Sequence, residues 1–543
     1  MSHELELSPK THLKANKTAT LVLPVFKNIK LNWWWISGII LIGAYRFTLL
    51  GQGALSFPDE FRYSSSADAL NSLLKGDFSG FCHNISSISG RPGDTMVRLV
   101  LMAIQQILTS LFGINYQNPD SLLIPQAINL LVSLLILVCF YKIAQLLLPE
   151  TPMVAPLATG IYALLGNTNL YIRHILPYDH AFLIFLATLY LVLKRQQQKF
   201  QPIALKTYIV AGASTAIAYT VYPGYYFLGV LIFCLLVGRG WGWVHFKSKL
   251  FGLGSFIVAG GSVLAFFEVL SQIGGTSYLF SSTKLAGNIK QGSFEESFTF
   301  LPKYLLEVEK IGGAILLLLT SIFILLNIVT SLKTKFHNYA EDDLWLVISV
   351  ILVCFLIQAS ASAIFYIAVF YGRLLHIYYP FLVLATIALL SRIKGDLLRK
   401  LVYLVVFSLF PASFVSFAID YAQLAYPRDV LYRQGYRIEN FSPGNVINES
   451  TPFSPFASPP PRDNQSGTPY NSFNKGKLIN FVYFYPIKTG DFRPYLPPSS
   501  LKLVFQNVHF LSFSAYSYEG FNKVERNLLK ERNYNVKIYA PKS

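Results

Sequence analysis

The sequence alternates between long apolar runs and short polar segments. The runs reach roughly 18 residues or more, the length that a helix needs to cross the hydrocarbon core of a bilayer. A spanning helix is apolar on all sides, so the ends of the runs and their flanking charges locate the helices better than periodicity does. The aromatic anchor Trp33, Trp34 and Trp35 opens the first run. Eleven spans are expected, at approximately 32–52, 121–146, 152–170, 179–194, 206–222, 224–238, 249–271, 310–332, 344–369, 375–391 and 400–419.

One further apolar stretch, residues 95–113 (TMVRLVLMAIQQILTSLFG), is ambiguous. It contains Arg98, Gln105 and Gln106, which are costly at the centre of a bilayer. The stretch therefore predicts an amphipathic helix that lies in the outer interface. Hydropathy alone leaves a twelfth span open as the alternative, and such a span would invert the sidedness of every later loop.

Composition and charge support this threading. The chain is 53% hydrophobic and 13% charged, whereas a soluble chain has about a quarter charged residues. The net charge is +17, and much of the excess lies in short loops that the threading puts inside together with the basic N-terminus, residues 1–31. The positive-inside rule and anionic headgroups both favour that placement, so the basic residues indicate topology rather than nucleic-acid binding. They are Lys10, Lys14, Lys17, Lys27, Lys30, Lys194, Arg195, Lys199, Lys206, Arg239, Lys247, Lys249, Arg392, Lys394, Arg399 and Lys400.

The C-terminal part of the chain has a different character. Residues 441–474 are rich in Pro, Ser and Asn and cannot bury a core, so 420–474 is expected to be a linker. Beyond it, strand-like runs surround a helix-like stretch at 522–533, which predicts a small domain over 475–543. The expected fold class is an all-α polytopic transmembrane bundle over 32–419 with a small α/β extracytoplasmic C-terminal domain.

The outer loops carry the candidate chemistry, beginning with Asp59 and Glu60 directly after the first span. Two adjacent carboxylates at a membrane surface suit a general base and its electrostatic partner. The alternative is an ordinary helix start, with Pro58 in the first turn and acids favoured by the helix dipole.

Three basic or acidic groups follow in other outer segments. Arg91 precedes the interfacial stretch, and a guanidinium forms bidentate bonds to phosphate, although a solvated loop arginine is equally typical. Asp179 lies at the start of a span, where it is either a site residue or an acid that only stabilises the helix dipole. Arg373 and His376 are expected on one helical face, where both can reach an anion at the interface, with a snorkelling arginine as the alternative.

These candidates all emerge on the extracytoplasmic side, in the loops 53–120, 171–178 and 370–374 and at the span starts beside them. Charged residues in the middle of the spans are nearly absent, since Arg46 and Glu268 lie toward the outer ends of their runs. This distribution favours a site at the outer surface rather than a path through the bilayer.

The order of these motifs resembles the GT-C membrane glycosyltransferases, and most of all the dolichyl-phosphate-mannose protein mannosyltransferases and the bacterial lipid A aminoarabinose transferases. The resemblance covers residues 30 to about 392 and rests on Asp59-Glu60, Arg91-Pro92, Arg373 and the following Pro380. Members commonly have His-Pro-Pro or Lys-Pro-Pro where this chain has Arg91-Pro92-Gly93, so the local backbone is expected to differ.

The resemblance implies an enzyme of the bacterial plasma membrane that transfers a sugar from a polyprenyl phosphate with inversion. Asp59 would act as the base, Glu60 and Asp179 would orient the acceptor or Asp59, and Arg91, Arg373 and His376 would bind the donor phosphate. The implied partners are the lipid-linked donor, membrane lipids and a glycan, lipid or protein acceptor, without nucleic acid.

Cofactors and metals are not expected. Cys139, Cys234 and Cys354 lie in apolar runs and Cys82 in a polar loop, so the cysteines indicate neither a disulfide framework nor zinc. A divalent cation held by the acids stays open, although the arginines make it less necessary. Loop 272–309 matches no part of the family pattern.

Two other functions remain as alternatives. A flippase of lipid-linked glycans would have ionisable residues deep in its helices and broken helices in both halves. A non-catalytic scaffold would use the C-terminal domain as its working part.

Overall fold

The computed structural model describes most of the helical region and three strands near the C-terminus. The described residues are 33–53, 58–87, 90–116, 118–149, 153–197, 203–238, 246–289, 297–333, 342–365, 372–423, 429, 433–434, 437, 479–486, 501–510 and 532–541.

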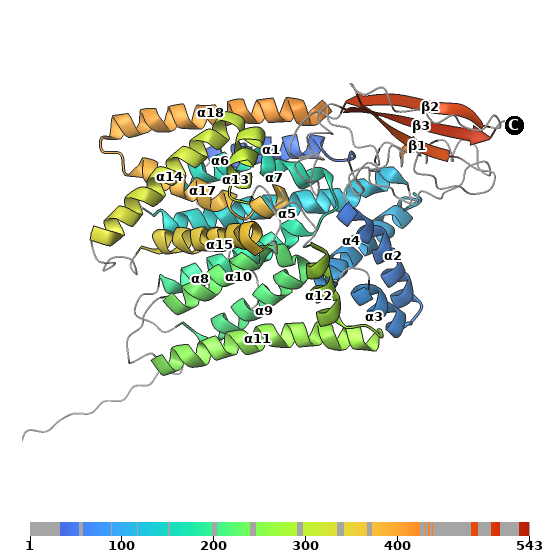
Figure 1. Cartoon of the computed structure of the whole chain (residues 1–543), viewed down its shortest axis with the longest axis horizontal. Coiled ribbons are helices and arrows are strands. Elements are labelled where there is room, and N and C mark those ends of the chain that lie inside the picture. Colours follow the sequence, from blue (N-terminus) through green and yellow to red (C-terminus); the bar gives the residue numbers. More distant parts are fainter. Residues whose placement is uncertain are drawn as a thin grey trace, which may run out of the picture.

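A helix overlaps each of the eleven expected spans, and most of these helices run along the long direction of the molecule (Figure 1). Five are long and apolar enough to cross a membrane: α5 together with the preceding 3-10 turn η3 (Pro119–Leu122), α11, α14, α15 and α18. These helices fit a multi-pass membrane protein, while the count of eleven spans stays a prediction. The eleven are α1 (Trp33–Thr48), α5 (Leu123–Leu147), α6 (Val154–Leu164), α8 (Tyr178–Gln196), α9 (Leu205–Val221), α10 (Tyr226–Gly238), α11 (Phe246–Ile273), α14 (Lys310–Lys333), α15 (Asp343–Phe365), α17 (Tyr379–Ser391) and α18 (Asp396–Gln423).

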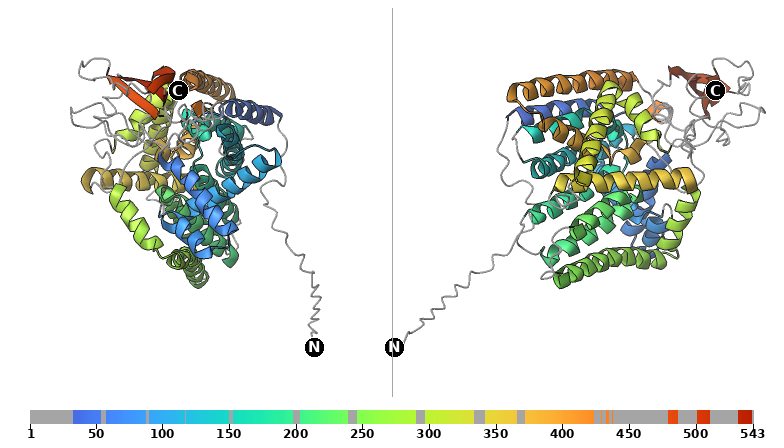
Figure 2. Two further views of the ribbon diagram at one scale, coloured as in Figure 1. Left: turned by 90° about the vertical axis from the view of Figure 1, so that its right-hand side faces the viewer. Right: turned by 60° about the vertical axis from the view of Figure 1, so that its left-hand side comes forward.

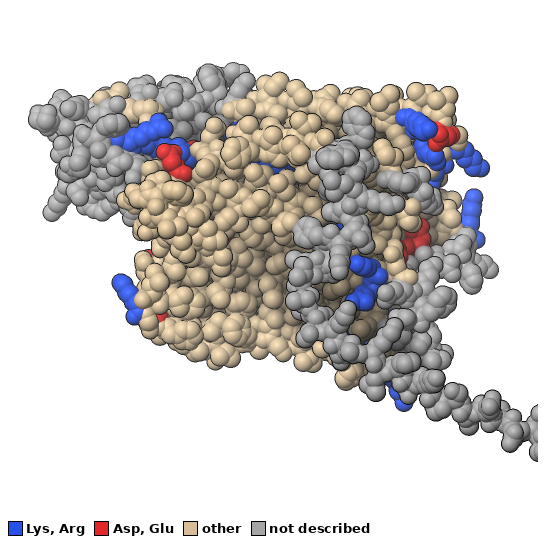
Figure 3. Space-filling view, turned by 180° about the vertical axis from the view of Figure 1, so that it is seen from behind, with Lys and Arg blue, Asp and Glu red and all other residues tan. Residues whose placement is uncertain are grey.

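The surface charge agrees with a membrane environment. Figure 3 shows Lys and Arg side chains gathered toward the two ends of the molecule, with a broad band of other residues between them. Helices α11 and α18 bury little of their length inside the protein and expose large apolar side chains, among them Phe251, Val258 and Leu404. Lipid is the solvent that suits such a surface.

Two expected spans differ from the structure in detail. The interval 152–170 is not one helix, because Leu165 is extended and separates α6 from the short α7 (Gly166–Leu170). The interval 375–391 begins with a turn, because α16 (Gly372–Leu375) ends one residue before His376 and α17 begins at Tyr379. The expectation that Arg373 and His376 share a helical face is therefore wrong.

Loop 53–120 folds into helices at one end of the bundle, the end that faces the viewer in the left panel of Figure 2. They are η2 (Pro58–Glu60), α2 (Phe61–Leu74), α3 (Phe78–Ser87) and α4 (Pro92–Leu111). The third outer loop supplies α12 (Tyr278–Ile289) and α13 (Phe300–Val308), and the remaining short turns are η4 (Tyr171–Arg173) and η5 (Pro223–Tyr225).

Helix α4 is amphipathic, and it turns its polar side inward. Asp94, Arg98 and Gln105 are buried, while Ile107 and Leu111 are more than half exposed. The helix has 20 residues, which is long enough to cross a bilayer, but it is not among the helices apolar enough to do so. Its exposed apolar side suits an interfacial helix, and the interfacial position stays a prediction.

The described C-terminal residues form an antiparallel sheet of order β1-β3-β2, which lies beside the end of α18 (Figure 1). Its strands are β1 (Ile479–Pro486), β2 (Leu501–Phe510) and β3 (Arg532–Pro541). The helix expected at 522–533 falls mostly outside the described residues, and its last two residues are strand instead. The α/β domain thus stays a prediction, as does the linker, whose first residues already belong to α18.

Candidate functional site

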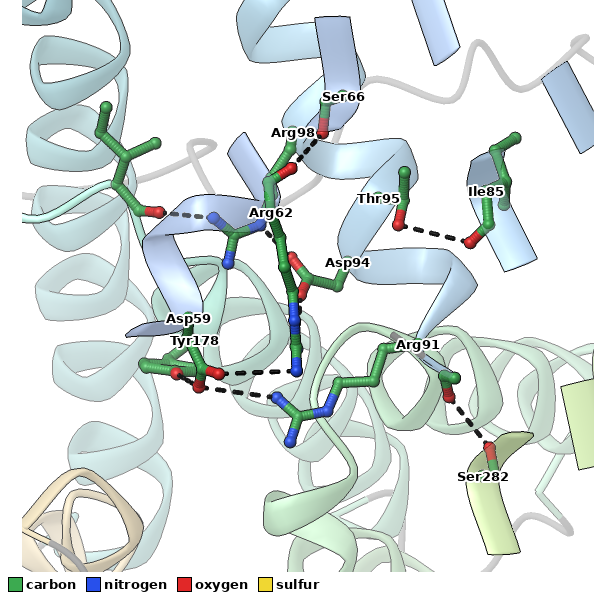
Figure 4. A network of polar contacts seen from close by, with 12 residues as sticks. Asp59, Arg62, Ser66, Ile85, Arg91, Asp94, Thr95, Arg98, Tyr178 and Ser282 are labelled. Carbon is green, nitrogen blue, oxygen red and sulfur yellow. Dashed lines mark hydrogen bonds and ion pairs between the residues drawn. The ribbon is translucent and has the colours of Figure 1, made fainter. Parts of the chain in front are cut away.

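Asp59 lies in the 3-10 turn η2 and faces cations from three separate segments. Figure 4 shows Arg62 and Arg91 beside it. Its Oδ1 is 3.5 Å from Arg62 Nη2, and its Oδ2 is 3.8 Å from Arg91 Nη1 and 3.3 Å from Arg373 Nη2. The hydroxyl of Tyr178 also donates a hydrogen bond to Oδ2. The carboxylate is 16% exposed, so it is held firmly yet remains accessible.

The arginines determine the charge state of Asp59. Burial alone would raise the pKa of this carboxyl, but Arg62, Arg373, Arg91 and the Tyr178 hydroxyl together hold the pKa well below its usual range. Asp59 is therefore ionised at neutral pH and is poised to accept a hydrogen bond.

A second carboxylate, Asp94, extends the network. Its Oδ2 is 3.3 Å from Arg62 Nη1, and its Oδ1 accepts a hydrogen bond from Arg98 Nε. Four guanidinium groups (Arg62, Arg91, Arg98 and Arg373) thus meet two carboxylates (Asp59 and Asp94). The difference, four minus two, is an excess of two positive charges at a largely buried site. Such an excess favours binding of an anion.

The backbone around Arg91 is fixed by α12. Gly90 has a φ of +59° and its carbonyl accepts a hydrogen bond of 2.9 Å from Ser282 Oγ. A Cβ at Gly90 would lie 2.9 Å from the backbone of Ser281, so only glycine fits this close approach. Pro92 then begins α4. The Arg91 guanidinium lies over the Tyr222 ring, 5.3 Å from its centroid.

Glu60, the next residue after Asp59, has different surroundings. It is fully buried, its Oε1 accepts a 2.6 Å hydrogen bond from the Ile175 N–H, and its Oε2 is 3.2 Å from His174 Nδ1. Arg98 Nη1 and Asn129 Nδ2 bond to the carbonyls of Ile175 and His174 from other helices. Glu60 therefore fixes the turn that leads into Tyr178, and its contacts are those of a positioning residue.

Asp179 and His376 meet each other rather than the arginines around Asp59. His376 Nε2 lies 4.0 Å from Asp179 Oδ1 and 3.2 Å from the Tyr162 hydroxyl. Its Nδ1 is 2.7 Å from Asn167 Oδ1, an acceptor, so Nδ1 carries the proton. Both ring nitrogens are engaged within the protein and the side chain is 5% exposed. The structure does not bring His376 to the anion site as a free donor.

The candidate residues thus fall into two groups. The structure brings Asp59, Arg91 and Arg373 together, and it places Glu60, Asp179 and His376 in the layer around them. Sequence reasoning missed Arg62, Asp94 and Arg98 as members of the network. Their spacing was a usable signal, because acid–base pairs three or four residues apart, such as Asp59 and Arg62 or Asp94 and Arg98, meet on one side of a helix.

Within the described ranges, no three His, Cys, Asp or Glu side chains gather in a way that would hold a metal ion. The charges that face Asp59 there are guanidinium groups.

No family model and no curated protein matches this sequence. Among solved structures, the chain is similar to a crystal structure of the Archaeoglobus fulgidus oligosaccharyltransferase, tethered to an acceptor peptide containing the NVT sequon. The identity is 11% and the TM-score 0.40, over 78% of this chain and 58% of that one. This chain therefore spans less than two-thirds of that protein's length, and a likeness this distant carries no argument about activity.

Proposed function

We propose that this protein is a glycosyltransferase that moves a sugar from a polyprenyl-phosphate donor to an acceptor hydroxyl on the extracytoplasmic side. One observation carries the proposal: an ionised, partly exposed Asp59 carboxylate stands among the guanidinium groups of Arg62, Arg91 and Arg373. Transfer from a phosphate leaving group requires a base that takes the acceptor proton and cations that stabilise the departing phosphate, and this site has both.

In the proposed step, the acceptor oxygen forms a bond to the anomeric carbon and its proton passes to Asp59. The bond from the anomeric carbon to the phosphate oxygen breaks, and its electron pair leaves with polyprenyl phosphate. A single displacement of this kind inverts the anomeric carbon. Because its pKa is low, Asp59 accepts a hydrogen bond from the hydroxyl first and takes the proton late, when bond formation has made the hydroxyl acidic.

The excess of two positive charges suits this leaving group. The donor phosphodiester has one negative charge, and the released phosphate monoester has about −1.5 to −2 at neutral pH. Arg91 and Arg373 therefore interact more strongly with the products of bond cleavage than with the bound donor. Interactions that strengthen in this way accelerate the reaction.

The proposal gives each remaining candidate a supporting role. Glu60 holds the turn before Tyr178, whose hydroxyl bonds to Asp59. Asp179 and His376 form the next layer behind Arg373. The order of the sequence motifs, which resembles the GT-C glycosyltransferases, and the uncharged band of the helical surface support a lipid-linked donor in a plasma membrane. The acceptor would be a glycan, a lipid or a protein.

A transfer assay tests the proposal directly. Purified protein in lipid nanodiscs is given radiolabelled polyprenyl-phosphate sugars and a crude envelope acceptor, beside Asp59→Asn. Asp396→Asn is the matched control, since Asp396 is paired with Arg399 at 2.9 Å and Lys400 at 2.6 Å but stands at the start of α18, away from the site. Label should move with the wild type and the control and not with Asp59→Asn. If no donor yields transfer, and labelled lipid instead crosses sealed vesicles, the protein is a flippase and the proposal fails.

A further inference from the structure

The backbone of the Arg373 turn is held by one amide side chain. Asn167, at the start of α7, donates from Nδ2 to the Gly372 carbonyl at 3.0 Å, and its Oδ1 is 2.7 Å from His376 Nδ1. Asn167 thus bonds to Gly372 at the start of the short helix α16 and to His376 directly after its end. The Arg373 carbonyl accepts a further hydrogen bond of 3.1 Å from the Tyr225 hydroxyl.

Asn167 is itself fixed by a buried acid from the third outer loop. Glu309, between α13 and α14, is 2% exposed, and its carboxylate accepts hydrogen bonds from the N–H groups of Gly166 (2.6 Å) and Asn167 (2.9 Å). One carboxylate therefore satisfies two N–H groups at the first turn of α7, which have no partner within the helix. A buried acid needs hydrogen-bond partners, and both oxygens of Glu309 find them at the start of α7, so Glu309 holds this helix start in place.

Tyr304 of α13 completes the support. Its hydroxyl accepts a hydrogen bond of 2.9 Å from Asn167 Nδ2. Its ring lies so close to Gly372 that a Cβ there would stand 2.4 Å from the hydroxyl oxygen. The backbone of the Arg373 turn is thus packed from the side of α13, while the Arg373 side chain, 13% exposed, reaches 3.3 Å from Asp59.

We propose that Asn167 and Glu309 are positioning residues that hold the Gly372–His376 turn, so that the Arg373 guanidinium stays against Asp59 and the donor phosphate. This gives the third outer loop a function through its last residues, Tyr304 and Glu309. The inference rests on the proposed function only in giving Arg373 a phosphate to bind. The effect of either residue on transfer must then pass through Arg373.

A double-mutant cycle measures that dependence. Asn167→Ala is expected to lower the rate of transfer roughly 10- to 100-fold, as small displacements of a catalytic group do. In an Arg373→Ala background, the same change should cost less than about 3-fold, because residues that act through one another are not additive. Glu309→Gln, which retains the shape of the side chain but only one acceptor oxygen, should give the same pattern. Additive losses in the cycle would overturn the proposal.

Hydrogen exchange tests the inference without any substrate. Asn167→Ala and Glu309→Gln should increase amide exchange at residues 372–378 in nanodiscs, because the turn opens more often. Asn327→Ala is the matched control: Asn327 is also buried, at 7% exposed, and its Oδ1 accepts a hydrogen bond of 3.0 Å from an arginine, Arg392, near the far end of α17. It should leave residues 372–378 unchanged.

The two readouts separate the possible failures. Unchanged exchange in both variants would show that the turn does not depend on Asn167 and Glu309, whatever the substrate is. Increased exchange in a protein that transfers no sugar would leave the positioning role standing and would refute the proposed function alone.

Discussion

Asp59 and Glu60 are neighbours in one turn of chain, yet their carboxylates have opposite surroundings. Asp59 is 16% exposed and meets three guanidinium groups, while Glu60 is fully buried and meets the N–H of Ile175 and the ring of His174. The first carboxylate is surrounded by side-chain cations and stays partly exposed to a substrate. The second carboxylate is fully buried and is held by a backbone N–H and a histidine ring.

The same contrast appears in the Gly372–His376 turn. Arg373 extends toward Asp59 and remains partly exposed, whereas His376 is buried against Asn167 and Tyr162. Each of two short turns thus provides one residue for the anion site and one for the framework behind it. The difference teaches that the role of a polar residue near a site follows from the groups that its atoms contact, and not from its distance along the chain.

The largest effect is expected for Asp59→Asn, which should lower the rate of sugar transfer roughly 10²- to 10⁴-fold, because a neutral amide cannot take the acceptor proton. The measurement is the initial rate per folded molecule, with folding judged by size-exclusion chromatography. Retention of more than about a tenth of the wild-type rate would mean that Asp59 is not the base.

Arg373→Lys should reduce the rate roughly 10- to 100-fold, because an ammonium keeps the charge but loses the planar pair of donors that fits phosphate. Competition by polyprenyl phosphate should weaken in parallel. His376→Gln, three residues away, is the comparison and should cost less than about 10-fold, since it acts only through the turn. Equal losses of rate at the two positions would show that Arg373 and His376 do not differ in role.

Glu60→Gln should act on stability more than on chemistry. Loss of one acceptor leaves a buried N–H or ring nitrogen unsatisfied and should lower the free energy of unfolding by about 1–3 kcal/mol. The denaturation midpoint in detergent measures this effect. Asp120→Asn is the control, because Asp120 is 74% exposed and its 3.0 Å pair with Arg433 should contribute less than about 1 kcal/mol. A large loss of transfer in a stable Glu60→Gln protein would assign Glu60 to the chemistry instead.

The smallest effect is a pH dependence from Glu309. Burial raises the pKa of this carboxyl from 4.5 to about 7, against the hydrogen bonds from Asn167, Gly166 and Tyr379 that lower it. A raised pKa means that the folded protein holds the proton more tightly, so this contribution to stability is complete below pH 4.5 and is lost as the pH rises through about 7. The neighbouring cation, Lys310, is paired with Asp420 at 2.8 Å.

The matching measurement compares thermal midpoints of the wild type and Glu309→Gln across pH 5 to 8. The wild-type midpoint should fall more steeply, because glutamine has no proton to lose. Parallel curves would show that Glu309 does not titrate in this range.

Much of the helical architecture could be predicted from the sequence, because in lipid every backbone N–H and C=O must be satisfied inside its own segment. A long apolar run therefore has to be a helix, and a helix lies in each expected span. Breaks within runs were not predictable. The extended Leu165 precedes the N–H groups of Gly166 and Asn167, which bond to Glu309. At the second break, Asn167 bonds to the Gly372 carbonyl and to the His376 ring.

The sequence by itself determined the helical class of this protein, the amphipathic character of α4 and the candidate residues Asp59, Arg91 and Arg373, since these depend on local composition and spacing. Only the tertiary structure decided which of the candidates meet. Asp59 and Arg373 are brought together by the packing of helices from opposite halves of the chain, and Glu60 is turned away by the N–H of Ile175. Contacts between distant segments leave no periodic trace in the sequence, because each requires only one polar residue at each end.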